Sequence, residues 1–236
     1  MIDNGVDYLH PALGGCFGSG CKVAFGYDFV GDNYDPKKVD DYYHPYPDSD
    51  PLDNCSEYSQ GTHVAGIITA NASNLSLGPY ATPFPFTGVA PGVTIGAYRV
   101  FGCSSRYSSD DVIVAAAYRA AEDGADVINI SIGSEPNYAD FFLHSALSRI
   151  SAAGHIVVQS NGNDGEGGIL SSGSVGSEVL SIASIDNLMY TTTVLKVDGA
   201  SYPYNSGYAN SNFIFPETLQ IVINGTSFEM SNSLIL

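Results

Sequence analysis

Strand-like and helix-like patterns alternate along the first 187 residues of the chain. Short apolar runs typical of strands are followed by segments in which apolar residues recur at helical spacing. The pattern predicts strands at 23–29, 93–101, 126–131 and 155–160, and helices at 63–70, between Ser109 and Gly124, and at 138–153. Because short connections join these elements, we expect right-handed crossovers and a parallel sheet with helices on both faces, which is an α/β fold.

The pattern changes after about residue 187. Helical periodicity stops, and residues 191–223 are rich in Tyr, Asn, Ser and Pro, with short apolar runs such as 193–197. This composition favours strands and loops of a different unit. We therefore expect one unit over residues 1–187 and a β and loop fragment over residues 188–236.

Composition and charge restrict the partners of the chain. Its 236 residues are 44% hydrophobic, and eight basic residues against 25 acidic ones give a formal charge of −17. Such a charge repels phosphate backbones and anionic lipid, so we expect no nucleic-acid and no membrane partner. No apolar run approaches the roughly 20 residues that span a bilayer. We expect a soluble monomer.

The acidic loop from Asp28 to Asp53 is the candidate for a metal site. Calcium prefers several oxygen ligands, which such a loop could supply. The spacing fits no EF-hand, however, and solvated acidic loops are common. The histidines form no ligand cluster with the cysteines. We therefore expect no cofactor, with calcium as the alternative.

Four cysteines indicate an extracellular protein. They form an even set with no metal-like CxxC pair, and the chain contains several N-x-S/T triplets, for example at Asn54 and Asn71. Both features are typical of secreted glycoproteins. The first residues lack the pattern of a secretory signal. Free core thiols in a cytosolic protein are the alternative reading.

Disulfide pairing has three possible arrangements for four cysteines. Cys16 and Cys21 enclose a Gly-containing turn that can bring their α-carbons together. We therefore expect a Cys16–Cys21 disulfide, which leaves Cys55 to pair with Cys103.

Three polar clusters follow strands or strand-like ends, namely Asp3-Asn4-Gly5, Ser131-Ile132-Gly133 and residues 160–165. In parallel sheets, functional groups lie in loops at the carboxyl ends of the strands. The clusters are therefore candidates for a common site.

A six-residue motif, Gly61-Thr62-His63-Val64-Ala65-Gly66, resembles the histidine motif of the subtilisin-like serine proteases. Other landmarks follow in that family's order: Ile2-Asp3-Asn4-Gly5-Val6, Gly88-Val89-Ala90-Pro91-Gly92, Ala97-Tyr98-Arg99-Val100-Phe101-Gly102, Asn129-Ile130-Ser131-Ile132-Gly133 and Ser160-Asn161-Gly162-Asn163-Asp164-Gly165. Together they cover about residues 1–187. The chain looks most like large secreted fungal members, which carry an inserted protease-associated domain.

The resemblance implies a serine endopeptidase that acts on proteins or peptides. In such an enzyme an imidazole takes the proton of the serine hydroxyl and a buried carboxylate orients the imidazole. The resemblance assigns the base to His63, the orienting carboxylate to Asp3 and the oxyanion donor to Asn163. The substrate-binding residues that it implies are Arg99, Val100, Phe101, Gly102, Ser131, Ile132 and Gly133.

The nucleophile is less clearly marked. Asn224-Gly225-Thr226-Ser227 resembles the serine motif, but the Pro-containing helix expected after the serine is missing. Either Ser227 is the nucleophile, or it lies in the start of an inserted region. Only two residues precede Asp3. Ser59-Gln60 stands where the family usually has a His or another fixed residue, a change that we expect to be tolerated. We expect weak or no activity, with a non-catalytic remnant that binds extended peptides as the alternative.

Overall fold

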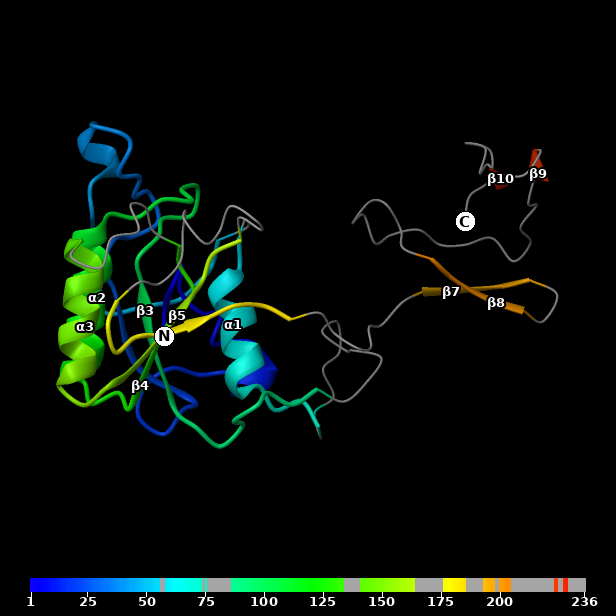
Figure 1. The fold of residues 1–236 in the computed structure, drawn as a ribbon, viewed down its shortest axis with the longest axis horizontal. Helices are drawn as coiled ribbons and strands as arrows, with labels where there is room; N and C mark the ends of the chain where they lie inside the picture. The colour runs from blue at the N-terminus through cyan, green and yellow to red at the C-terminus, as the bar shows by residue number, and fades with distance from the viewer. Residues whose placement is uncertain are drawn as a thin grey trace. The chain divides into compact units, whose positions relative to one another are not determined.

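A six-stranded parallel sheet organises the first part of the computed structural model (Figure 1). Its order is β2-β3-β1-β4-β5-β6. The strands are β1 (Ile2–Asp3), β2 (Val23–Asp28), β3 (Ile95–Arg99), β4 (Val127–Ile130), β5 (Ile156–Ser160) and β6 (Leu180–Ile182). The structure describes residues 1–55, 58–73, 75, 86–133, 141–163 and 176–185, and the backbone of 193–197, 200–204, 223–224 and 227–228.

Helices cover both faces of this sheet, as the α/β expectation requires. The helices α2 (Asp110–Glu122) and α3 (Phe142–Ala152) lie side by side against one face, and α1 (Gln60–Thr69) lies on the other (Figure 1). Two short 3-10 helices, η1 (Pro11–Leu13) and η2 (Asp41–Tyr43), lie in the loops. The fold class is thus confirmed.

The helix expected at 63–70 begins earlier, at Gln60. The Ser59 side chain makes no capping hydrogen bond. Instead the Gly61 amide donates to the Asn4 Oδ1 atom at 2.7 Å, which satisfies one of the N–H groups left open at a helix start. Because the cap comes from a residue distant in sequence, local spacing could not reveal where this helix begins.

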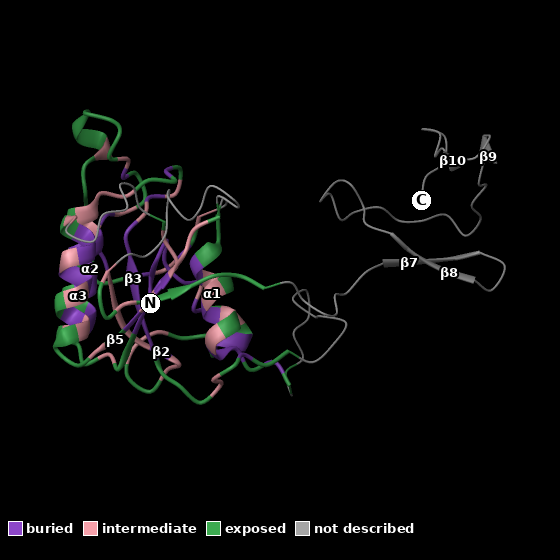
Figure 2. Ribbon diagram, in the orientation of Figure 1, coloured by how far each residue is buried: buried purple, intermediate pink, exposed green. Residues whose placement is uncertain are grey.

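The core has two layers, one on each face of the sheet (Figure 2). Toward α2 and α3, Ile128 and Ile130 pack with Ile113 and Leu147. Toward α1, the layer includes Ala65, which is fully buried. A side chain this small allows the helix to approach the sheet closely.

β1 lies at the centre of the sheet although it has only two residues. Ile2 is in register with Tyr98 of β3 and with Ile130 of β4. The Val100 amide donates to the Asp3 carbonyl at 2.9 Å. These pairings leave Asp3 only 3% exposed.

The chain divides into two compact units, Met1–Ser184 and Ile185–Leu236. The described part of the second unit consists of two antiparallel pairs: β7 (Thr193–Val197) with β8 (Ala200–Tyr204), and β9 (Ile223–Asn224) with β10 (Ser227–Phe228). Among the described residues, no helix is long and apolar enough to cross a bilayer.

Both expected disulfides are present. Cys16 is bonded to Cys21, with α-carbons 5.6 Å apart, and Cys55 to Cys103, with α-carbons 5.2 Å apart. The second bond joins the loop before α1 to the loop after β3, which are distant in sequence.

Candidate active site

A cleft of about 590 Å³ lies where several parallel strands end. Parallel strands place their carboxyl ends at one edge of the sheet, so the loops after β3, β4 and β5 meet there. The residues that line this cleft are Gln60, Phe101, Arg106, Tyr107, Ser108, Asp110, Ile113, Ser131, Ile132, Gly133, Ser160, Gly162 and Asn163. It therefore brings together five of the residues that the sequence placed at the substrate: Phe101, Ser131, Ile132, Gly133 and Asn163.

The wall formed by Ser131–Gly133 is held by side chains from two neighbouring strands. Asn129 donates through Nδ2 to the Ser131 hydroxyl at 3.0 Å, and Gln159 donates through Nε2 to the Ile132 carbonyl at 3.3 Å. Gln159 is 1% exposed. Buried amide contacts of this kind fix the path of the backbone that faces the cleft.

Gln60, the first residue of α1, is the residue of that helix that lines this cleft. Its Nε2 group donates to the Ser131 carbonyl at 2.8 Å. The sequence marked this position only as a departure, because Ser59-Gln60 stands where the resembling family usually has a His or another fixed residue. That departure was the signal available.

His63 lies one turn further along α1 and lines a different cavity. This second cavity measures about 370 Å³, and its walls include His10, Leu13, Ile67 and Phe86. The two cavities share no lining residue. Within the described part of the chain, no hydrogen bond joins His63 to Asp3, so the structure does not bring these two expected partners together.

Asp3 is the last residue of β1, and only one oxygen of its carboxylate accepts a hydrogen bond from the described residues. Its Oδ1 atom accepts a hydrogen bond from the Asn4 amide at 2.9 Å. Its Oδ2 atom is buried and has no hydrogen-bond partner among the described residues. Burial raises the pKa of Asp3 to about 7, although the Asn4 amide opposes this shift.

Arg99 was expected to bind substrate, but its side chain is buried in the interior of the first unit. Its Nη1 atom lies 3.3 Å from Asp28 and 2.8 Å from Asp32, and its Nε group donates to the Phe101 carbonyl at 3.1 Å. The side chain is 3% exposed. The two carboxylates hold it away from the cleft, and it acts as a structural ion pair.

Two neighbours of Arg99 are also turned away from the cleft. The Val100 side chain is fully buried in the core. Gly102 packs against the 32–34 loop so closely that a Cβ atom would lie 2.3 Å from the Tyr34 carbonyl oxygen. Of the four residues expected in this stretch, only Phe101 lines the cleft with its side chain.

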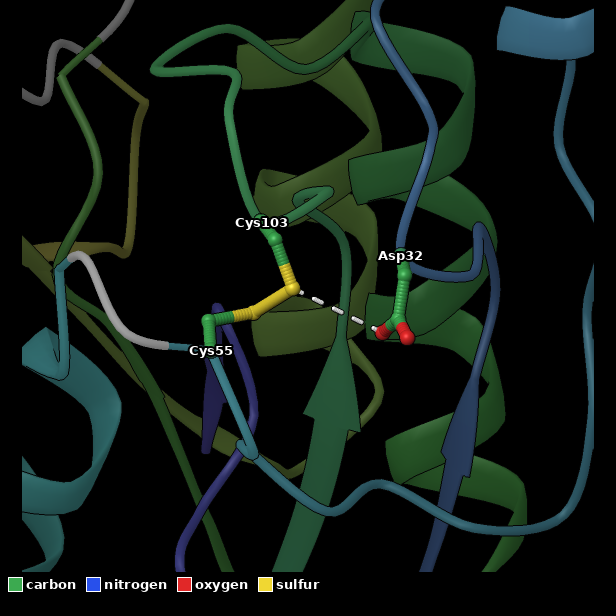
Figure 3. Close-up of side chains that lie close together, drawn as sticks. All are labelled: Asp32, Cys55 and Cys103. Atoms are coloured by element: carbon green, nitrogen blue, oxygen red, sulfur yellow. Dashed lines mark hydrogen bonds between the residues drawn. A yellow bond between two sulfur atoms is a disulfide. The ribbon is translucent and has the colours of Figure 1, made fainter.

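A cluster of Asp32, Cys55 and Cys103 has atoms close enough to suggest a metal site (Figure 3). The Cys103 sulfur lies 3.6 Å from the Asp32 Oδ1 atom. Both sulfurs are bonded to each other, so neither is available as the thiolate that binds metal. Asp32 is already paired with Arg99, and this cluster is therefore structural.

The acidic loop expected as a calcium alternative surrounds a cavity of about 510 Å³. Five carboxylates line it together with Arg99, namely those of Asp28, Asp32, Asp41, Asp48 and Asp50. The guanidinium pairs with two of these carboxylates, Asp28 and Asp32, and calcium in this loop stays the alternative expectation.

Ser227 lies in β10 of the second unit, where the structure describes only the backbone. Its role as the nucleophile stays a prediction.

Comparison with known proteins shows the family of the chain. The family model described as "Subtilase family" matches residues 1–234, which includes the segment expected to be an insertion or truncated end. Minor extracellular protease Vpr of Bacillus subtilis is 39% identical over 71% of this chain and 18% of its own length. The nisin leader peptide-processing serine protease NisP of Lactococcus lactis is 34% identical over 70% of the chain and 22% of its own length.

A solved structure supports the same assignment at the level of the fold. Sphericase covers 86% of this chain and 57% of its own, with a TM-score of 0.51 at 24% identity. The chain spans about a fifth of the length of Vpr and NisP. Both are bacterial proteins, and these comparisons do not show the particular resemblance to fungal members. On the family match over residues 1–234, the chain belongs to the subtilase family.

Proposed function

We propose that this chain is a serine endopeptidase unit that binds protein or peptide substrates in an extended form, with weak or no hydrolytic activity of its own. The observation that carries the proposal is the cleft at the strand ends. Its walls contain Phe101, Ser131–Gly133 and Asn163. These are the segments that the sequence marked as substrate-binding.

The cleft suits an extended peptide. Backbone groups along Ser131–Gly133 can pair with the main chain of a peptide regardless of its sequence. Phe101 and Tyr107 offer apolar surface for its side chains. We therefore expect the cleft to bind peptides of many different sequences.

Hydrolysis requires a nucleophile, a base, a carboxylate that orients the base and a donor to the oxyanion. The serine oxygen bonds to the substrate carbonyl carbon while a base takes the hydroxyl proton and returns it to the leaving amine. Water then releases the acyl group. Asn163 is the candidate donor to the oxyanion, Asp3 the candidate orienting carboxylate and Ser227 the candidate nucleophile. His63, the base that the resemblance assigns, lines the other cavity.

An extracellular location is part of this proposal. Two disulfides support it, because such bonds persist in oxidising compartments. The relative Vpr is named as extracellular. Asn54 and Asn71 are exposed and suit glycosylation, whereas Asn129 lies within β4 and does not.

Peptide binding by the full chain tests the proposal. A fluorescently labelled decapeptide without charged residues is titrated with the protein, and its anisotropy is followed. Phe101→Ala removes one wall of the cleft and is expected to weaken binding about tenfold. Phe142→Ala on α3 is the control, since Phe142 is exposed and does not line the cleft. Equal affinity of both variants, or no binding at all, would contradict the proposal.

The non-catalytic alternative is favoured by one observation. Within the part of the chain that the structure describes, no histidine lines the cleft.

A further inference from the structure

We infer that Gln60, and not His63, occupies the place of the general base in this chain. The inference deepens the proposed function and rests on it, since it uses the same cleft. A base must be reachable by the bound substrate and must also contact the carboxylate that orients it. The positions of Gln60 and His63 show which of the two residues meets each requirement.

Access to the substrate favours Gln60. Its side chain is exposed, lines the cleft and donates to the Ser131 carbonyl, part of the wall that a peptide would contact. His63 is also exposed but lines the other cavity. An imidazole at position 63 therefore does not face the groups around Asn163.

Proximity to Asp3 also favours the first turn of α1. Gly61 lies so near the end of β1 that a Cβ atom there would be 3.1 Å from the Asp3 Cβ atom and 2.1 Å from the Gly5 carbonyl oxygen. Only glycine fits this contact. The backbone next to Gln60 is therefore held against the end of β1 that carries Asp3.

The Oδ2 atom of Asp3 has the environment expected where an imidazole base has been replaced: the carboxylate remains, but the ring N–H that would donate to it is missing. Its Oδ2 atom is buried without a partner among the described residues, in a side chain that is 3% exposed. A buried acceptor without a donor is unfavourable and rare in folded proteins. A carboxylate that orients an imidazole has this atom satisfied by the ring N–H.

The chemical consequence follows from the amide group. A carboxamide can accept a hydrogen bond, but it does not take up a proton at neutral pH. A serine hydroxyl that depended on Gln60 as its base would therefore not be activated. The Gln60 Nε2 group, moreover, already donates to the Ser131 carbonyl. The cleft holds peptide without efficient turnover.

Gln60→His tests the inference by histidine titration in NMR, which does not depend on activity. The introduced imidazole is expected to titrate at higher pH than in the double variant Gln60→His/Asp3→Asn, because the Asp3 carboxylate favours the charged ring. The titration of His63 is expected to be the same with and without Asp3→Asn. If instead His63 responds to Asp3→Asn and the introduced imidazole does not, the inference is wrong.

Labelling by a fluorophosphonate probe gives a second readout on the full chain. Gln60→His is expected to raise labelling about a hundredfold or more. Gln60→Ala, which frees the Ser131 carbonyl without adding a base, is the matched control and is expected to give no gain. An equal gain in both variants would contradict the inference.

The two proposals can fail separately. Coupled titration of the introduced imidazole with Asp3, but no labelling, would support the position of Gln60 and count against Ser227 as the nucleophile. Loss of decapeptide binding in the unmodified chain would contradict the proposed function, whereas the titration would still decide which residue contacts Asp3.

Discussion

Arg99 shows how one buried charge organises a large part of the first unit. Its guanidinium contacts Asp28, Asp32, the Leu52 carbonyl and both sulfurs of the Cys55–Cys103 bond, the sulfurs at 3.4 Å. These contacts connect β2, β3 and the loop before α1. Arg99 therefore stabilises the strands and the loop that support the cleft.

Arg99→Met is expected to lower the free energy of unfolding by about 3–5 kcal/mol, because it leaves Asp28, which is 1% exposed, without its cation. Urea denaturation at neutral pH measures the effect. Arg119→Met is the control: Arg119 pairs with Asp123 at 3.0 Å on the surface, where such a pair contributes less than about 1 kcal/mol. Similar losses in the two variants would contradict the buried role of Arg99.

Asp3 should make stability fall as pH rises. Its pKa is about 7 in the folded chain, above its ordinary value of 3.8, so the folded state binds the proton more tightly than the unfolded state does. Its contribution to the free energy of unfolding is therefore fully present below about pH 4 and is lost as pH rises to about 7. The loss is at most about 4 kcal/mol.

Asp3→Asn removes this titration. Urea denaturation of both proteins at intervals from pH 4 to pH 8 is expected to show a flatter pH dependence for the variant. Parallel curves for the two proteins would show that Asp3 does not titrate in this range.

At the scale of elements, the start of α1 depends on β1. Asn4 accepts a hydrogen bond from the Gly61 amide and donates to the Tyr58 carbonyl. Both contacts fix the turn that carries Gln60 into the cleft. The geometry of the candidate site is therefore set partly by the Asn4 side chain, which lies 57 residues before Gly61 in the sequence.

Asn4→Ala is expected to lower the free energy of unfolding by about 1–2 kcal/mol, the usual range for loss of a helix cap. It should also speed hydrogen exchange at the Gly61 amide. Asn4→Asp keeps the acceptor and should retain slow exchange at that amide. Fast exchange in Asn4→Asp, or slow exchange in Asn4→Ala, would show that Asn4 does not cap the helix.

Sequence patterns were sufficient for the strand and helix alternation, which depends on periodicity, and for the Cys16–Cys21 disulfide, which depends on a local turn. The Cys55–Cys103 pair then followed because only two cysteines were left. The patterns were insufficient for Arg99. The pattern of its own strand, β3, does not show that Asp28 at the end of β2 and Asp32 in the following loop pair with its guanidinium. Sequence patterns also favoured His63 over Gln60. Both residues lie near the start of one helix, and the difference between them becomes visible only in the structure, where they line separate cavities.

At the scale of the whole molecule, the two disulfides enclose very different lengths of chain. Cys55 and Cys103 are 48 residues apart, whereas Cys16 and Cys21 are 5 apart. In the chain-entropy description, the longer loop stabilises by about 4 kcal/mol and the shorter one by about 2 kcal/mol.

Replacing both cysteines of a pair by serine tests this difference. Loss of Cys55–Cys103 is expected to lower the midpoint of urea denaturation more than loss of Cys16–Cys21 does. The larger effect is also expected because Arg99 packs on the longer-range bond. The reverse order would contradict this account.

The central position of β1 determines the order in which the sheet can assemble. β1 pairs with Tyr98 on one side and Ile130 on the other, and both lie later in the chain, so neither neighbour exists when β1 is synthesised. The β4-α3-β5 segment, by contrast, joins strands that are close in sequence. Folding should therefore begin in that half, with β1 inserted late between strands already formed. Such long-range pairing slows folding, because a large loop must close before its contacts form.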